Sequence, residues 1–154
     1  MKNEDALNID SYAVVKSAPT AFAGGTTNAR GDSAGTGASH TLFTVTGDVS
    51  VILMPVCTVD LAGSGKLEVG VVGNLAGIVA ETTATDIDVN DIWTAAAPAD
   101  VGVIAFGSLV GPFAVVNGLD IIETTTTADI TSGQIYYQCL WRPISLDGKV
   151  VKAA

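Results

Sequence analysis

The chain has few basic residues, few aromatic residues and only two cysteines. Seven Lys and Arg residues stand against sixteen Asp and Glu residues, so the formal net charge of the 154 residues is −9. A surface of this sign repels nucleic-acid phosphates and anionic lipid headgroups over about a Debye length. We therefore expect neither a nucleic acid nor a membrane as a partner.

The two cysteines, Cys57 and Cys139, lie far apart in sequence on segments that are predicted to be buried strands. In a reducing cytosol, such residues are more often free core thiols than a disulfide. No group of His and Cys residues has the spacing of a zinc site. A chain of this length buries roughly 68–70 % of its unfolded surface, so we expect it to fold without a metal or a disulfide.

The chain also lacks a recognisable targeting or membrane-spanning segment. Met1-Lys2-Asn3-Glu4-Asp5 carries charges of both signs with no apolar region behind it, so we expect no secretory signal and synthesis in the cytoplasm. The longest charge-free stretch runs from Val101 to Leu119, but Gly, Pro and Asn residues interrupt it. It predicts two buried strands joined by a Gly-Pro turn rather than a transmembrane helix.

Val, Ile, Ala, Thr and Gly are abundant, and this composition favours β-structure. From Thr41 onward, short apolar runs alternate with turn residues at about the 8–12-residue spacing of a sandwich or barrel. We predict an all-β fold over residues 41–154: a single antiparallel β-sandwich or barrel of jelly-roll type.

Particular turns predict how the strands follow one another. Gly63-Ser64-Gly65 predicts a hairpin between the apolar run at 49–59 and the alternating segment at 66–72. In that segment, apolar side chains at every second position share one face. Asn117-Gly118 is typical of a type I′ turn and predicts a hairpin between the strands on either side of it.

Residues 1–40 differ from the rest of the chain. After the short apolar piece Tyr12-Ala13-Val14-Val15, the run at 17–39 is built mainly of Ala, Gly, Thr and Ser. Such a segment buries too little apolar surface to offset the entropy lost on ordering. We predict a flexible or extended N-terminal arm that is mobile in the free protein and becomes ordered on a partner.

Two patterns in this arm resemble functional motifs. Gly31-Asp32-Ser33-Ala34-Gly35 matches the nucleophile elbow of serine hydrolases, and the only histidine, His40, follows it. The elbow requires a strand before the serine and a helix after it, and neither is predicted here. Arg30-Gly31-Asp32 spells an integrin-binding tripeptide. We interpret it as part of a solvated loop, and we predict no hydrolase activity.

A phosphate-binding loop is the next candidate to be excluded. Gly63-Ser64-Gly65-Lys66 has only the end of that motif, with Asp60 where the first glycine belongs. Leu67 replaces the hydroxyl residue that binds the metal. A β-turn explains these residues better.

The segment at 83–97 holds no clean period and predicts a long loop with a short helical turn. Asp86-x-Asp88-x-Asn90 begins like a calcium loop, but Asp91 replaces the turn glycine and Ala97 replaces the bidentate glutamate. An EF-hand is excluded, and we favour a solvated acidic loop over an irregular calcium site. We therefore assign no catalytic, cofactor-binding or metal-binding residue, and we expect no cofactor and no enzyme.

Three aromatic residues cluster near the C-terminus. Tyr137 and Trp141 share strand parity with Cys139, whereas Tyr136 faces the other way. Core packing is the interpretation we favour. Contact with a carbohydrate or a protein is the alternative, because Tyr and Trp suit interfaces where one end of the side chain stays wet.

The C-terminal sequence Tyr-Tyr-Gln-Cys-Leu-Trp-Arg-Pro-Ile-Ser at 136–145, followed by Asp-Gly-Lys-Val-Val at 147–151, resembles the ending of small structural proteins encoded in the head modules of tailed bacteriophages. The resemblance extends through a Thr/Ala-rich middle to a Phe-x-Val-x-Gly strand that begins at Phe43. It does not cover the residues before His40.

The resemblance implies a decoration protein, also called a capsid cement protein. Such a protein sits on the exterior of the capsid in the virion and clamps neighbouring subunits of the major capsid protein, commonly as a homotrimer. It would be synthesised in the host cytoplasm. The alternative is a tail-associated module, a β-sandwich that binds a receptor or a carbohydrate through Trp141 and the nearby tyrosines.

Overall fold

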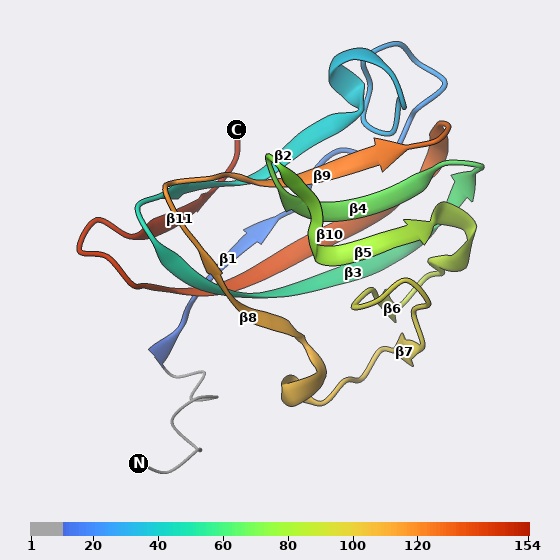
Figure 1. The fold of residues 1–154 in the computed structure, drawn as a ribbon. Helices are drawn as coiled ribbons and strands as arrows, with labels where there is room; N and C mark the ends of the chain where they lie inside the picture. Colours follow the sequence, from blue (N-terminus) through green and yellow to red (C-terminus); the bar gives the residue numbers. More distant parts are fainter. Residues whose placement is uncertain (1–10) are drawn as a thin grey trace.

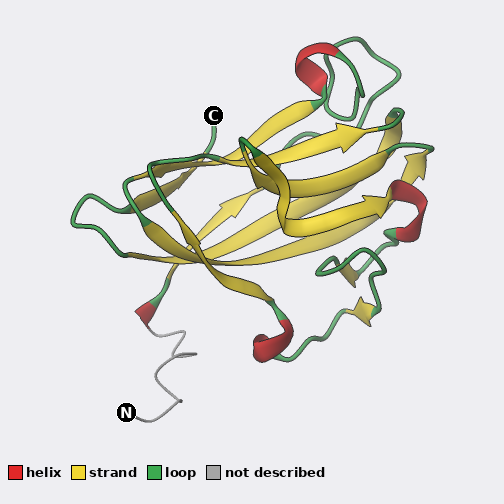
Figure 2. Cartoon of the chain, in the orientation of Figure 1, coloured by secondary structure: helices red, strands yellow, loops and turns green. Residues whose placement is uncertain are grey.

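The structure is a computed structural model that describes residues 11–154, and these residues form two antiparallel β-sheets packed face to face (Figure 1). Loops and short 3₁₀ helices join the strands (Figure 2). The predicted all-β sandwich is confirmed, and the sheets do not close into a barrel. Within residues 11–154, no helix has the length and apolar character needed to span a membrane.

The first sheet has six strands in the order β1-β10-β3-β6-β7, with β8 paired to β3. Its strands are β1 (Ala13–Ser17), β3 (Val49–Gly63), β6 (Asp91–Ile92), β7 (Asp100–Val101), β8 (Val110–Val115) and β10 (Ile130–Pro143). The two long strands β3 and β10 pair along their whole lengths and form the centre of this sheet.

The second sheet has five strands in the order β11-β2-β9-β4-β5. Its strands are β2 (Ser39–Thr46), β4 (Lys66–Val71), β5 (Asn74–Thr83), β9 (Ile121–Thr126) and β11 (Lys149–Lys152). The alternation predicted for β4 is confirmed, because Leu67 and Val69 are fully buried and Val71 packs against the core.

Two connections predicted to be hairpins cross between the sheets instead. Asn117 and Gly118 have positive φ angles of 57° and 63°, as a type I′ turn requires. However, β8 before this turn pairs with β3, and β9 after it pairs with β2 and β4. Likewise, β3 and β4 lie in different sheets. Turn residues reverse the chain, but the partner of each strand is set by which apolar face it must bury.

The stretch from Val101 to Leu119 also differs from the expectation of two buried strands. It contains one complete strand, β8, of which only Val110 and Val115 are buried, and Gly111 and Pro112 lie within that strand rather than in a turn. The residues before it form the end of β7, a loop and the 3₁₀ helix η5 (Phe106–Ser108). Val101 and Val103 are exposed, so this apolar stretch contributes side chains to the protein surface as well as to the core.

The main core lies between the sheets. Its largest fully buried side chains include Trp93, Tyr137, Phe43, Leu53 and Leu67. The indole Nε1 of Trp93 donates to Thr82 Oγ1 at 2.8 Å, which satisfies the one polar atom of that ring. As predicted, Cys57 and Cys139 are free thiols buried in this core.

The N-terminal segment is part of the sandwich from Ala13 onward, so the structure has no boundary at residue 40. Strand β1 pairs with β10, with Val15 opposite Cys139. The loop that follows continues along β10, where the Phe22 N–H donates to the Gly133 carbonyl at 3.0 Å, and Phe22 is buried in the main core. Residues 1–10 of the predicted arm lie outside the described residues.

Glycine explains why a segment of small residues can dock in this way. The Gly24 N–H donates to the Ile130 carbonyl at 2.9 Å. A Cβ atom on Gly24 would lie 2.3 Å from the Gly31 carbonyl oxygen and 2.6 Å from that of Ile130, which is too close for any side chain. The composition that suggested disorder therefore permits close backbone packing against β10.

Candidate functional site

A buried ion pair joins this N-terminal segment to the five-stranded sheet. Arg30 Nε lies 2.8 Å from Glu123 Oε1 and Arg30 Nη2 lies 2.6 Å from Glu123 Oε2, and both side chains are 1 % exposed. Two parallel donors on one carboxylate form the strongest geometry for such a pair. Arg30 also donates to the Thr20 carbonyl and stacks on the Phe22 ring, and the Tyr137 hydroxyl donates to Glu123.

The charge of Glu123 keeps Arg30 protonated, and burial together with the same charge keeps Tyr137 protonated. Burial alone would lower the pKa of Arg30, but the charge of Glu123 and its hydrogen bonds outweigh burial and raise that pKa. Burial, and then the charge of Glu123, raise the pKa of Tyr137 well above its ordinary value of 10.0. Burial lowers the pKa of His40, which faces Glu123 across the β2–β9 pair. We interpret the cluster as a set of polar contacts that attach the N-terminal segment to the core, rather than as a catalytic centre.

The expectation that Arg30-Gly31-Asp32 lies in a solvated loop is wrong. Arg30 is 5 % exposed and Asp32 is 8 % exposed. The Asp32 carboxylate accepts hydrogen bonds from the backbone N–H groups of Asn28 at 2.6 Å and Ala34 at 2.9 Å. The partner of Arg30 lies on a distant strand, so local composition could not reveal its burial.

The Ser33 hydroxyl of the elbow pattern is also used structurally. It donates to Asp129 Oδ1 at 2.7 Å, and the Ser33 backbone N–H donates to the same oxygen at 2.9 Å. These two bonds fix the loop to the turn that precedes β10. The pattern is followed by the 3₁₀ helix η3 (Gly35–Gly37), which is too short to be the helix of an elbow.

Hydrogen bonds within the acidic segment at 83–97, and one to Asp60 of β3, hold that segment in place. The predicted short helical turn is present as η4 (Ala84–Asp86). The Asp91 carboxylate accepts the Asp88 N–H at 2.8 Å, and Asp60 accepts the Val89 N–H at 2.6 Å. Among residues 11–154, no three His, Cys, Asp or Glu side chains are arranged to hold a metal ion.

The three clustered aromatic residues follow the predicted parity. Tyr137 is fully buried, and Trp141 packs against the main core from a partly buried position. Tyr136 lies on the opposite face of β10, where the Lys16 ammonium sits 4.1 Å from the centre of its ring. Core packing therefore accounts for two of the three rings.

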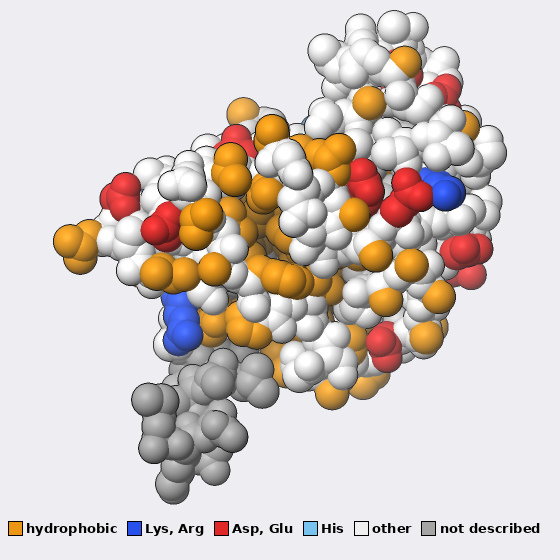
Figure 3. Space-filling view, in the orientation of Figure 1, with side chains coloured by type: hydrophobic (Ala, Val, Ile, Leu, Met, Phe, Trp, Pro, Cys, Tyr) orange, Lys and Arg blue, Asp and Glu red, His pale blue; other side chains and the backbone are white. Residues whose placement is uncertain are grey.

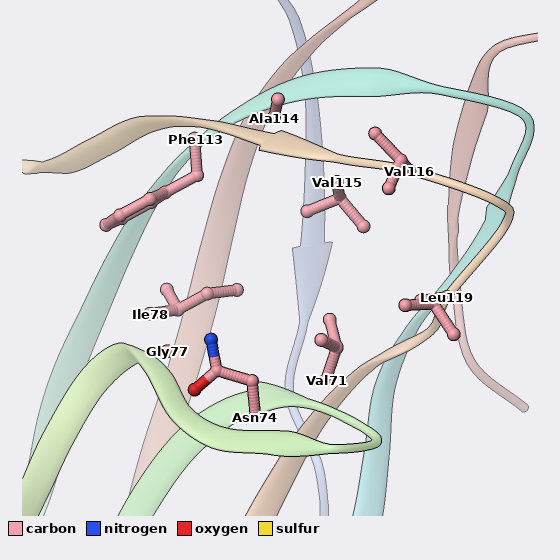
Figure 4. Close-up of a pocket in the computed structure, with 9 residues that line it drawn as sticks. All are labelled: Val71, Asn74, Gly77, Ile78, Phe113, Ala114, Val115, Val116 and Leu119. Atoms are coloured by element: carbon pink, nitrogen blue, oxygen red, sulfur yellow. The ribbon is translucent and has the colours of Figure 1, made fainter.

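An apolar cleft opens between β8 and the β4–β5 hairpin, with a cavity volume of about 170 Å³. Phe113 and Val115 extend from β8 toward Val71 and Ile78 on the opposite side (Figure 4). In the space-filling view, hydrophobic side chains line the hollow in the middle of this face (Figure 3). Asn74 contributes a polar amide, and no charged residue lines the cleft. It can accept an apolar group of about the size of a benzene ring.

The outer faces of the two sheets differ in polarity. On the five-stranded sheet, Lys66 Nζ lies 2.8 Å from Glu81 Oε1, and the Thr126 hydroxyl donates to Glu81 at 2.9 Å. Such a polar outer face is usual for an antiparallel sheet with one solvated side.

Apolar side chains also lie on the outer face of the six-stranded sheet, beside polar ones such as Gln138, which lies opposite Met54. Residues paired across the β3–β10 ladder share a face, and Ile52 lies opposite Leu140 while Val56 lies opposite Tyr136. Met54 lies on the same face between them. A sheet face of this kind is normally covered by another element or by a partner.

The loop before β8 covers only part of that face. Leu109 is buried there against Ile52 and Leu140. The same loop leaves Val103 81 % exposed and Phe106 53 % exposed. We use the name outer-face patch for two groups of residues. Met54, Val56 and Tyr136 are half-buried and line a pocket on this face, and Val101, Val103 and Phe106 are exposed on β7 and the loop before β8.

Sequence reasoning missed both the cleft and the outer-face patch. One signal for the patch was present, because the run at 51–56 is apolar at every position rather than at alternate ones. Such a run is typical of a strand that is buried on both faces. No family model, no curated protein and no solved structure matches this chain.

Proposed function

We propose that this protein is a decoration protein that binds the outside of a bacteriophage capsid and stabilises it by clamping neighbouring major capsid subunits. The observation that carries the proposal is the outer-face patch, an apolar surface on a chain whose net charge is −9. Exposed apolar side chains that gather near one another commonly mark a protein-binding surface. The major capsid protein is proposed as the partner because the C-terminal sequence resembles that of phage head proteins.

The fold suits this role because part of the patch lies on a preorganised support. Met54, Val56 and Tyr136 belong to β3 and β10, which pair over their full lengths, so little ordering entropy is lost there when a partner binds. A protein that binds only the assembled shell stabilises that shell in proportion to its occupancy and affinity. A homotrimer would gain further, since all of its contacts must break together before it dissociates.

The net charge of −9 sets the expected salt dependence. We expect charge complementarity at the rim of the contact, which speeds association and weakens as salt is added. The apolar centre supplies the salt-independent part of the affinity.

The alternative of a receptor-binding or carbohydrate-binding module gains no support from the aromatic residues. Stacking on a sugar needs exposed rings, but Tyr137 is fully buried and Trp141 packs against the core. Only Tyr136 remains, so the three rings on which this alternative rests do not form one exposed stacking surface.

The test is a binding assay with heads that lack this protein. Val103→Asp places a charge in the outer-face patch, and Val151→Asp places the same charge at an exposed valine on the other sheet. Loss of one buried valine contact, before any cost of burying the charge, weakens binding by about tenfold or more. We expect that loss for Val103→Asp and near wild-type binding for Val151→Asp.

Two results would count against the proposal. Equal binding by the two variants would show that the patch is not the contact surface. Failure of the wild-type protein to co-sediment with heads at all would remove the proposed function.

A further inference from the structure

The loop between β10 and β11 exposes the apolar side chain of Leu146, which we call the knob. Leu146 is 109 % exposed, the highest value among the large apolar residues of 11–154, and Ile144 in the same loop is 59 % exposed. The loop projects from one end of the sandwich, at the left in Figure 1. Single exposed apolar residues are common on proteins, so exposure alone assigns no role to Leu146.

What distinguishes this loop is that it is held in one shape. The Asp48 N–H donates to Ser145 Oγ at 2.8 Å, and Ser145 Oγ donates to Asp147 Oδ1 at 2.7 Å. The Ile144 N–H donates to the Asp48 carbonyl at 2.9 Å, and the Gly148 N–H donates to the Ser145 carbonyl at 3.0 Å. Leu146 is therefore presented from a fixed loop, which lowers the entropy lost when it enters a pocket.

The cleft between β8 and the β4–β5 hairpin has the size and polarity to receive this side chain. Its volume of about 170 Å³ is close to that of a cavity known to hold benzene, roughly 150 Å³, and the side chain of leucine has only four carbons. The mouth of the cleft is apolar too, since Val116, one of the residues that line it, is 44 % exposed. Leu119 closes one end of the cleft (Figure 4).

We propose that Leu146 of one copy of this protein inserts into the cleft of a second copy. Knob and cleft are two different surfaces of the same chain, so the contact is heterologous and can repeat around a closed ring such as a trimer. The full exposure of Leu146 shows that it does not fill the cleft of its own chain. This contact goes beyond the proposed function, because it requires no capsid.

The charge of the protein predicts how salt affects this contact. Two copies, each with a formal net charge of −9, repel one another at low ionic strength. The cleft itself contributes no charged side chain to the contact. Added salt should therefore strengthen self-association, which is the opposite of the effect expected at the rim of a capsid contact.

Cysteine cross-linking tests the contact directly. One variant carries Leu146→Cys, and a second carries Val116→Cys at the mouth of the cleft. The native thiols do not interfere, because burial raises the pKa of Cys57 to about 11 and that of Cys139 to about 12, so both stay protonated and enclosed. In oxidised glutathione, we expect a disulfide-linked dimer from the mixture and little from either variant alone.

The control replaces the cleft variant with Val59→Cys, an exposed position that does not line the cleft. No product from the first mixture, or as much product with Val59→Cys, would overturn the proposal. Light scattering gives a second readout, in which Leu146→Ser should weaken self-association by about tenfold or more. A wild-type protein that is monomeric at its highest soluble concentration would also overturn it.

Failure of this contact can be told apart from failure of the proposed function. A chain that cross-links between copies but does not bind heads keeps the self-contact and loses the capsid role. A chain that binds heads but does not cross-link between copies keeps the capsid role and loses the self-contact.

Discussion

Replacing Arg30 with methionine should destabilise the protein strongly, because it leaves the Glu123 carboxylate buried without its counter-charge. Both side chains of the pair are 1 % exposed, so water cannot take the place of the lost partner. Removing one member of a buried ion pair costs about 3–5 kcal/mol of unfolding free energy. For a domain of this size, that corresponds to a fall in melting temperature of roughly 6–20 °C.

A double-mutant cycle separates the ion pair from general damage to the core. Glu123→Gln removes the charge but keeps an acceptor for the Tyr137 hydroxyl, which donates to this side chain. Each single variant leaves one charged or polar group unpaired, whereas the double variant leaves no buried charge. The cost of the double variant should therefore be smaller than the sum of the single costs by about 0.5–3 kcal/mol.

The assay is urea denaturation with linear extrapolation, and an exposed ion pair provides the control. Lys66 and Glu81 are joined at 2.8 Å, but their side chains are 41 % and 39 % exposed. Lys66→Met should therefore cost less than about 1 kcal/mol. The reasoning fails if Arg30→Met costs no more than Lys66→Met, or if the costs of Arg30→Met and Glu123→Gln simply add.

Two further predictions concern the docked N-terminal segment and the buried thiols. Gly24→Ala should lower the free energy of unfolding by about 1–3 kcal/mol, because the new Cβ would collide with two backbone carbonyls. Gly25→Ala should change it by less than about 0.5 kcal/mol, because nothing lies within 4 Å of a Cβ at that position. Equal stabilities of the two variants in urea would contradict the docking of this segment. Burial raises the pKa of Cys139 from 9.0 to about 12, so the folded state keeps a proton that the unfolded state releases, and unfolding free energy should fall as pH rises above about 9. In denaturation series across this pH range, Cys139→Ala should show a shallower fall than wild type, and an identical slope would contradict the assignment.

The sequence predicted the features of the fold that depend on local pattern. Leu67 and Val69 face the core because alternation along a strand places every second side chain on one face. Cys57 and Cys139 are buried because they lie in apolar strand sequences. Asn117 and Gly118 adopt the positive φ angles that their residue types favour.

The features that the sequence did not predict depend on pairing between distant segments. Arg30 is buried because Glu123 lies at the centre of a strand that is remote in sequence. The composition of the segment around Gly24 predicts disorder. However, the absence of a side chain on Gly24 is what lets the backbone approach Ile130.

The candidate binding surfaces depend on the same long-range pairing. Phe113 and Ile78 come from strands in different sheets, so the cleft between them exists only once the sandwich has formed. The outer-face patch likewise combines β3 and β10 with the loop before β8. Its only local signal was the non-alternating apolar run in β3.

We propose that this protein stabilises a capsid by occupying its outer surface, and this proposal can be tested directly. The most direct measurement compares heads that carry this protein at full occupancy with heads that lack it, following genome release during a temperature ramp. Because a ligand that binds only the assembled shell stabilises that state by mass action, heads with the protein should release their genome at a higher temperature. Identical release profiles for the two kinds of head would contradict the claim.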